Sequence, residues 1–482
     1  MASQPHRSRA ALLSALALLL LAASCRAETR ASRGRVFLLI GDGMGLPSEI
    51  AASRYRHGED RGLAWHSFPF QAWAATWDVT SYDARAAAEG KPSYDEAGAD
   101  PFVGYDPARG GTGPWPAASA PAGAEAYLLA AATDSAAAAT AMSTGRKTDA
   151  GNIAWKRGDP LLGGQLDTLT EIMESLYGGS SAVLSTVPFD HATPAAFVAH
   201  SMGRGSYPSI ARQMIGADLA AIIGGGHPDA CATYLDAAGL GVLRSTAHWR
   251  LLEREPGAAQ STCDAALAAA AAALPAGVGL FGLYGGADGS YGTPLPSDSP
   301  GTPSLAPGAD GPTLAASVAA AAGILAARGG PFLLVAEQGE IDWANHANDY
   351  GRMVGAVCSL DDAVRAVEAF VDRPGDDIDW GNSLLVVTAD HATGMLRFDP
   401  SAEVAAKGDL PEAAGAGVYA FPGGTARYAT TGHSNELVTI AAKGALAETV
   451  FARWLGAGRP GTRIVENAAI FEAILAFLDS AP

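Results

Sequence analysis

Short apolar runs rich in β-branched residues recur along the chain and alternate with long alanine-rich stretches. The apolar runs fall at 36–40, 182–187, 332–335, 384–387 and 437–441, and two long alanine-rich stretches fall at 314–327 and 357–370. Uniformly apolar strands that alternate with helices are typical of a parallel sheet buried on both faces. The sequence therefore predicts an α/β fold: a central, mostly parallel β-sheet with helices on both faces, arranged as a three-layer sandwich.

The body of the chain, residues 33–482, is predicted to be a single domain with surface insertions. The full chain has 482 residues, of which 48% are hydrophobic, so a large core can be buried. Stretches rich in glycine, proline and serine interrupt the alternation at 106–123 and 285–311. We therefore expect insertions near 78–124 and 285–313, on the surface of the domain.

The first residues have the pattern of a secretory signal peptide. Arg7 and Arg9 precede an apolar run at 10–23, which is shorter than the roughly 20 residues that a membrane-spanning helix needs. No second long apolar stretch follows in the sequence. We therefore expect the protein to be exported from a bacterial cell.

Two cleavage sites fit this signal peptide. The apolar run ends in Ala-Ala-Ser-Cys, which resembles a bacterial lipoprotein site with a signal peptide of residues 1–24 and a lipid anchor on Cys25. Ordinary cleavage after Ala27 would instead remove residues 1–27. The alternatives predict a membrane-anchored lipoprotein or a free periplasmic or extracellular protein.

The charge of the chain limits its partners. The formal net charge is −18, and no run of lysine or arginine appears in the body of the chain. Binding to nucleic acid or to an anionic membrane requires a basic patch, so no nucleic-acid-binding surface is expected. An acidic surface also repels anionic substrates, so any phosphate chemistry would need locally bound cations.

Acidic and imidazole side chains follow three of the predicted strands directly. Asp42, Glu337 and the pair Asp390 and His391 each come just after an apolar run. In an open α/β sheet, ligands bind beyond the carboxyl ends of the strands. Clustered carboxylates repel one another unless cations lie among them. These residues therefore predict a cation site at that edge of the sheet.

A second set of potential metal ligands lies further along the chain. Asp342 and His346 are four residues apart, so on a helix they share a face and can hold one metal. His433 lies in a glycine-containing turn before the 437–441 run. Carboxylate with imidazole favours zinc, whereas all-oxygen ligand sets favour magnesium.

Ser135 is the candidate nucleophile. It follows Asp134 and precedes a run of alanines with high helix propensity. A serine at a helix N-terminus is either an ordinary cap or a residue placed where free N–H groups favour a phosphate. No Ser-His-Asp context is evident, so activation of this serine would have to come from a metal.

Six segments, taken together, resemble the motifs of the alkaline phosphatase family. They are Asp-Gly-Met-Gly at 42–45, Asp-Ser-Ala at 134–136, His-Ala-Thr-Pro-Ala at 191–195, Glu337 to His346, Thr-Ala-Asp-His at 388–391 and Gly-His-Ser at 432–434. They occur in the family's order and cover essentially the whole body of the chain. The resemblance implies hydrolysis of small phosphate monoesters to alcohol and inorganic phosphate through a phosphoserine on Ser135.

The resemblance also implies two zinc ions and one magnesium ion. The first zinc would be held by Asp42, Asp390 and His391, and the second by Asp342, His346 and His433. Thr193 and Glu337, with Asp42 as a bridging carboxylate, would form the magnesium site. Arg204 would hold the phosphate, with Asp134, His191 and Trp343 beside the ligands. A homodimer is also an expectation from the family.

Other functions remain as alternatives. A phosphodiesterase of the same superfamily commonly uses threonine as its nucleophile and lacks the third metal site, whereas Thr193 and Glu337 are present here. A sulfatase needs proline and arginine where this chain has Ala137 and Ala139. A non-catalytic metal-binding or phosphate-binding surface protein would not need an intact nucleophile.

The cysteines add one further expectation. Besides Cys25, the chain contains Cys231, Cys263 and Cys358. An oxidising compartment permits a disulfide between Cys231 and Cys263. Cys358 lies in an apolar helical pattern and is expected to be a buried thiol.

Overall fold

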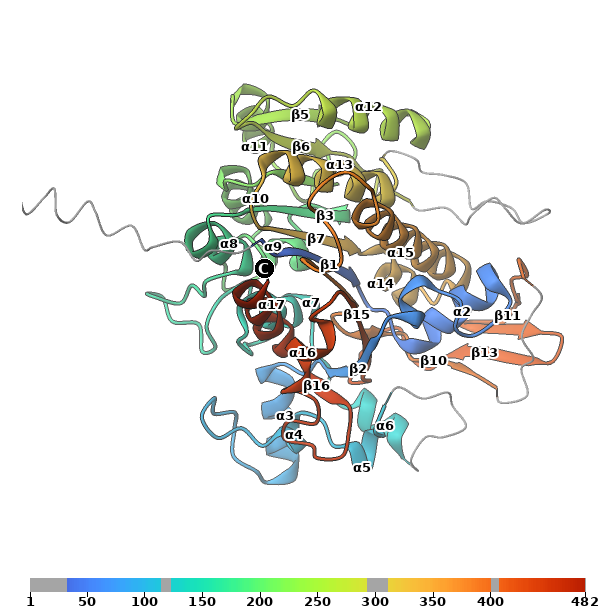
Figure 1. Ribbon diagram of the computed structural model, residues 1–482. Coiled ribbons are helices and arrows are strands. Elements are labelled where there is room, and N and C mark those ends of the chain that lie inside the picture. Colours follow the sequence, from blue (N-terminus) through green and yellow to red (C-terminus); the bar gives the residue numbers. More distant parts are fainter. Residues whose placement is uncertain (1–32, 114–122, 293–310, 400–406, 482) are drawn as a thin grey trace, which may run out of the picture.

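The structure, a computed structural model, describes residues 33–113, 123–292, 311–399 and 407–481. A ten-stranded sheet runs through the middle of the molecule (Figure 1). Its strands, in spatial order, are β16 (Ile464–Glu466), β2 (Phe70–Ala75), β15 (Val438–Lys443), β8 (Ser383–Thr388), β1 (Arg35–Gly41), β7 (Phe332–Gln338), β3 (Ser180–Pro188), β4 (Ala221–Gly225), β6 (Gly279–Leu283) and β5 (Trp249–Glu253). Strand β15 is antiparallel to β2 and β8, and all other neighbours in this sheet are parallel. The predicted mostly parallel sheet is confirmed.

Helices lie on both faces of the sheet. One layer contains α2 (Leu46–His57), α12 (Gln260–Ala272), α13 (Leu314–Arg328) and α15 (Tyr350–Val371). In this layer α12 packs against α13, α13 against α15, and α15 against α2. The other layer contains α7 (Ser135–Thr144), α8 (Leu169–Tyr177), α9 (Ala192–Ala196), α16 (Ala447–Ala452) and α17 (Ala469–Ser480). Helices α10 (Tyr207–Gly216) and α11 (Ala237–Ser245) pack together beside β4 and β5. The three-layer arrangement agrees with the sequence prediction.

The central strands of the sheet are apolar because they are buried on both faces, as the sequence analysis predicts. Every residue of β1, β7 and β8 is buried, because each strand is covered on both faces by helices. These three strands are neighbours in the order β8, β1, β7, and they run in the same direction. Their carboxyl ends therefore meet at one edge of the sheet.

Two small sheets lie outside the central one. A four-stranded antiparallel sheet contains β10 (Leu396–Phe398), β13 (Gly424–Tyr428), β12 (Val418–Phe421) and β11 (Glu412–Gly415). Strands β9 (Ala392–Thr393) and β14 (His433–Ser434) pair with each other. This short pairing brings the segment after β8 next to the segment before β15.

The segment near 78–124, which the sequence analysis predicts to be an insertion, lies in a helical layer with its own hydrophobic cluster. It contains α3 (Val79–Glu89), α4 (Pro101–Gly104), α5 (Pro107–Gly110) and α6 (Ala124–Leu129), after the short 3₁₀ helix η1 (Ala64–Ser67) and strand β2. Trp77, Tyr82, Tyr105 and Tyr127 are buried in a second hydrophobic cluster of this layer. Most of the second expected insertion, at 293–310, and residues 114–122 lie outside the described residues.

One expectation about the cysteines is wrong. Cys231 and Cys263 are not joined by a disulfide, although Cys358 is fully buried as expected. The signal peptide and Cys25 lie outside the described residues. Among the helices of the described ranges, none is both long and apolar enough to cross a membrane.

Candidate metal centre and active site

Ser135 is the first residue of α7. The carboxylate of Asp134 caps this helix by accepting a hydrogen bond of 3.0 Å from the backbone N–H of Ala137, and it also accepts one of 3.0 Å from the N–H of Gly151 in a later loop. The Ser135 side chain is 2% exposed, and its Oγ lies 3.1 Å from Nε2 of His391. The predicted nucleophile thus lies at a helix N-terminus, where the helix dipole favours an anion, and it contacts one of the predicted metal ligands.

Asp42, Asp390 and His391 form a fully buried cluster at the carboxyl ends of β1 and β8. Nε2 of His391 lies 3.4 Å from Oδ1 of Asp42 and 3.3 Å from Oδ2 of Asp390. Four ligands around a tetrahedral zinc, with bonds of about 2.0–2.1 Å, lie roughly 3.3 Å from one another. With Ser135 Oγ at 3.1 Å, the separations from His391 match the edges of such a tetrahedron.

Asp342, His346 and His433 form a second cluster nearer the surface. Asp342 and His346 share a face of α14 (Glu340–His346), as predicted, and His433 comes from β14. Nε2 of His346 lies 3.2 Å from Oδ2 of Asp342 and 3.1 Å from Nε2 of His433, which lies 3.6 Å from Oδ1 of Asp342. These separations are again those of ligands around one small cation.

The ring nitrogens of His346 and His433 face each other as two ligands of one metal ion would. Nδ1 of His346 bonds to the carbonyl oxygen of Thr431, and Nδ1 of His433 lies 2.8 Å from the carbonyl oxygen of Thr133. A carbonyl only accepts, so each Nδ1 carries a proton, and the two Nε2 atoms face Asp342 and each other. They lie 3.1 Å apart, and a metal ion bound there would use both as ligands.

Thr393 fixes the orientation of ligands from both clusters. Its Oγ1 donates a hydrogen bond of 2.6 Å to Oδ1 of Asp342 and lies 3.2 Å from Nδ1 of His391. Because the Thr393 proton goes to the carboxylate, Nδ1 of His391 donates to the hydroxyl, and the lone pair on Nε2 points at Ser135 and the carboxylates. The sequence reasoning missed Thr393, since nothing in its local pattern distinguishes it from other threonines.

The predicted third site is a set of buried oxygens. Asp42, Thr193 and Glu337 are all fully buried. Both carboxylate oxygens of Asp42 and Oε1 of Glu337 have no hydrogen-bond partner among the described residues, while Oε2 of Glu337 accepts from Ser185 Oγ. Buried carboxylate oxygens without partners are costly unless a cation compensates them. An all-oxygen set of this kind suits magnesium.

The electrostatics of the carboxylates lead to the same conclusion. Burial, together with the charges of Asp390, Asp342 and Glu337, raises the pKa of Asp42 well above its usual value. Burial raises the pKa of Glu337 and takes that of Asp390 to about 7. Burial alone would also raise the pKa of Asp342, but its hydrogen bond with His346 and the nearby imidazoles lower it. These carboxyls cannot all ionise near neutral pH without bound cations.

Arg204 is held beside the serine by two of the predicted neighbours. Its Nη1 donates to Oδ2 of Asp134 at 3.0 Å, and its Nη2 lies 3.4 Å from Nε2 of His191. Burial and the Arg204 charge lower the pKa of His191 to about 3, so this ring is neutral and accepts from the guanidinium. The ring of Trp343 packs edge-on against His191, with centroids 5.8 Å apart. All the predicted site residues are therefore in one region.

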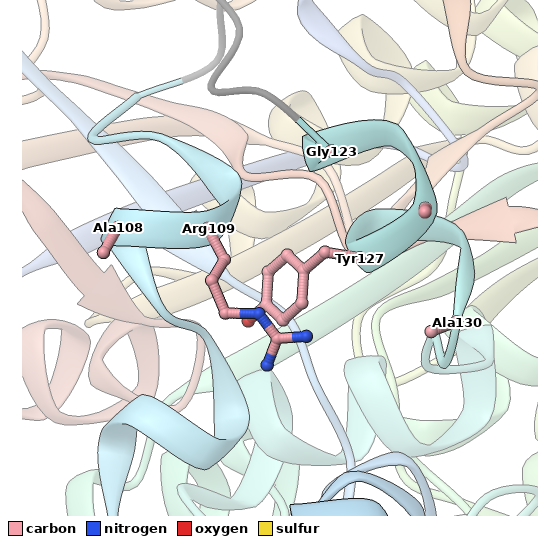
Figure 2. A pocket seen from close by; sticks show the side chains of 6 residues that line it. Ala108, Arg109, Gly123, Tyr127 and Ala130 are labelled. Carbon is pink, nitrogen blue, oxygen red and sulfur yellow. The ribbon is translucent and has the colours of Figure 1, made fainter.

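Two other histidines pair with glutamates that belong to neither cluster. His200 bonds to Glu171, and His227 bonds to Glu253, each at 3.0 Å. A separate pocket of about 290 Å³ lies between α5 and α6 and contains none of the candidate ligands (Figure 2). There the guanidinium of Arg109 lies 4.3 Å from the centre of the Tyr127 ring. This pocket belongs to the insertion layer and not to the candidate centre.

Two clusters of carboxylate and imidazole side chains lie near a helix-terminal serine, at the carboxyl edge of a mostly parallel sheet. This arrangement fits the class of α/β hydrolases that use metal ions. Comparison with known proteins narrows this class. The family model for alkaline phosphatase matches residues 124–233 and 278–407. The alkaline phosphatase of Escherichia fergusonii is 27% identical over 447 residues, which cover 86% of this chain and 82% of that protein.

Further relatives agree with this match. Streptomycin-6-phosphate phosphatase of Streptomyces griseus is 29% identical over 490 residues, covering 92% of this chain and 94% of that protein. The alkaline phosphatase of the Antarctic bacterium TAB5 has the same fold, with a TM-score of 0.60 and 22% identity over 93% of this chain and 99% of that one. The chain belongs to the alkaline phosphatase family, and it is a phosphatase.

Proposed function

We propose that this chain hydrolyses phosphate monoesters to an alcohol and inorganic phosphate through a phosphoserine on Ser135, with two zinc ions and one magnesium ion bound. The observation that carries this proposal is the pair of facing Nε2 atoms on His346 and His433, 3.1 Å apart, beside the Asp342 carboxylate. The ligand separations in both clusters suit zinc.

The residues of the three sites divide by donor type. Asp42, Asp390 and His391 would hold one zinc, and Asp342, His346 and His433 the other. The magnesium would lie among Asp42, Thr193 and Glu337. Variants of the Antarctic enzyme have been solved with magnesium in a site called M3, which supports a third, magnesium-binding site in this chain. Such ions stabilise negative charge on phosphate oxygens and favour ionised hydroxyl groups near neutral pH.

Ser135 provides the nucleophile in this mechanism. Its Oγ loses a proton and forms a bond to phosphorus while the bond from phosphorus to the alcohol oxygen breaks, and that oxygen takes up a proton to leave as the alcohol. Water later gives its hydroxyl to phosphorus and a proton to Oγ, which releases phosphate and restores the serine. Arg204 holds non-bridging phosphate oxygens through its guanidinium. The N-terminus of α7 adds free N–H groups, and Asp134 keeps Arg204 turned toward the serine.

The accessibility of the two clusters indicates where the leaving group lies. The cluster next to Ser135 is fully buried, whereas the His346 side chain is 41% exposed. The alcohol portion of the substrate would therefore extend past the second cluster toward solvent. Because the alcohol portion would lie near solvent there, we expect the enzyme to recognise the phosphate group and to accept different alcohols.

Comparing an aryl phosphate monoester with the corresponding bis-ester, with and without a chelator, tests the proposal. We expect chelator-sensitive turnover of the monoester that zinc and magnesium restore. A preference for the bis-ester would favour a phosphodiesterase, and no turnover of either would favour a non-catalytic binder.

A matched pair of variants tests whether turnover depends on the candidate metal centre. We expect His391→Gln to abolish turnover and zinc retention, because it removes a buried ligand. His227→Gln changes a histidine that is also buried but bonds to Glu253, so it should retain both. Loss of turnover in both variants would show only that a buried histidine had been disturbed.

We also propose that the protein is exported, as a lipoprotein anchored at Cys25 or as a free periplasmic or extracellular protein. The positive residues and apolar run at the start of the sequence support export. Mass spectrometry of the N-terminus of protein recovered from cells distinguishes cleavage before Cys25 from cleavage after Ala27. Detection of the intact Met1 terminus on the recovered protein would contradict export through a cleaved signal.

A further inference from the structure

The loop at 156–164 is held in a closed form at its base. The backbone N–H of Lys156 donates to the carbonyl of Gly164 at 2.7 Å, and Trp155 and Gln165 pair across the neck. The N–H of Leu166 donates to the carbonyl of Ala154 at 2.9 Å. These bonds present the tip of the loop in one fixed arrangement.

Two adjacent leucines at this tip are almost fully exposed. Leu161 is 81% exposed and Leu162 is 91% exposed, whereas the other exposed large apolar side chains of the described ranges, Phe102, Met202 and Val242, are 42–49% exposed. Single exposed apolar residues are common, but two neighbouring leucines on a closed loop form a contiguous apolar tip. Such a tip indicates a surface that receives it.

The loop is connected through α8 to the point where the N-terminal segment joins the domain. Gly34, at the start of the described body, packs against Phe477 and Leu478 of α17. Asp479 of the same helix accepts a hydrogen bond of 2.8 Å from Tyr177, at the end of α8. Helix α8 begins shortly after the loop. Figure 1 shows the blue-green loop and the start of β1 on one side of the molecule, and α14 on the other.

The segment between Cys25 and Arg33 is short enough to hold this side of the domain near a membrane. Cys25 is eight residues before Arg33, and eight residues reach at most about 28 Å. An acyl group on Cys25 would therefore hold this side of the domain close to the bilayer. One acyl chain alone gives only marginal binding, and stable anchoring takes a second contact.

We propose that Leu161 and Leu162 insert into the apolar boundary of a lipid bilayer and provide this second contact. The basic residues at the loop neck bond to carbonyls within the protein, Lys156 to Gly163 and Arg157 to Tyr94. The exposed groups at the tip itself are the two leucines, so their transfer into lipid should depend little on salt. A second copy of the chain is a poorer fit, because two side chains supply little of the roughly 800 Å² per partner in a stable interface.

This orientation leaves the candidate centre open to solvent. The ligands lie at the carboxyl ends of the strands, and Arg33 lies at the opposite end of β1. Substrates would reach the centre from the side away from the membrane. The proposal does not depend on the phosphatase mechanism, because it concerns a separate surface.

Sedimentation with vesicles tests the contribution of the loop without the anchor. The protein would start at residue 25 and carry Cys25→Ser, so that it has neither the signal peptide nor an acylated thiol but contains the whole described body. Vesicles of phosphatidylethanolamine and phosphatidylcholine provide an uncharged bilayer. The double variant L161Q/L162Q keeps the size of the tip, and Val242→Gln is a control on the exposed face of α11.

We expect the parent protein to bind these vesicles at low and high salt. L161Q/L162Q should lower its partition coefficient at least roughly tenfold, because two apolar side chains lose their transfer into lipid, whereas V242Q should not. Equal binding of parent and double variant, or no binding by the parent, overturns the proposal. Conversion of a dimer to a monomer by L161Q/L162Q, seen by light scattering, would identify the tip as a self-association surface instead.

Discussion

Thr393→Val is the most informative single substitution outside the ligand sets. Valine has nearly the same shape as threonine, so it leaves no cavity but removes the 2.6 Å hydrogen bond to Asp342 and the 3.2 Å contact with His391. A hydrogen bond to a charged group contributes roughly 1.5–3 kcal/mol, and one between neutral groups roughly 0.5–1.5 kcal/mol. The two clusters should therefore be weakened unequally.

We expect zinc affinity to fall about 30-fold at the Asp342 cluster, from a loss of about 2 kcal/mol, and about fivefold at the His391 cluster. Chelator titration with measurement of retained zinc would resolve the two losses. Thr144→Val is a matched control, because Thr144 is a buried threonine whose hydroxyl bonds only to nearby backbone, at the carbonyl of Thr140 and the N–H of Arg146. Unchanged chelator midpoints, or the same change in the control, would refute the positioning role of Thr393.

Two further substitutions test other parts of the structure. Arg204→Ala should weaken competitive inhibition by inorganic phosphate roughly 10- to 100-fold while Asp134 still caps α7, because charge-assisted bonds to the anion are lost; unchanged inhibition would exclude Arg204 from the phosphate site. Burial raises the pKa of Asp190 to about 7, and neither carboxylate oxygen has a partner among the described residues. The folded state therefore binds this proton more tightly than the unfolded state, and stability falls as pH rises from about 4 to about 7, by up to about 4 kcal/mol. Asp190→Asn should remove this fall in denaturant unfolding measurements, and identical pH profiles for the two proteins would contradict the assignment.

The fold and the metal ligands could be predicted because they depend on strong local patterns. The runs that became β1, β7 and β8 are apolar throughout, so their strand character and burial were evident. Their parallel order then determines that Asp42, Glu337 and Asp390 meet, although they are distant in sequence. The i, i+4 spacing placed Asp342 and His346 on one helix face for the same kind of reason.

Other features depend on tertiary contacts that no local pattern reports. Strands β4 and β6 contain glycine and are only five residues long, so their apolar pattern is weak. The hydrogen bonds that orient the histidines come from Thr393 and from the carbonyls of Thr431 and Thr133, which only the folded chain brings close. The expected disulfide was wrong because sequence spacing does not determine whether two cysteines approach each other.

The central claim is that Ser135 becomes phosphorylated during turnover. Acid quenching of the metal-loaded enzyme while it hydrolyses a phosphate monoester, followed by peptide mass spectrometry, measures this directly. We expect phosphate on Ser135 in the wild-type peptide and no phosphopeptide from Ser135→Ala, which should retain zinc and only slow residual turnover. Turnover without any phosphoserine in the wild type, or phosphate at another residue with full activity in Ser135→Ala, would contradict the account.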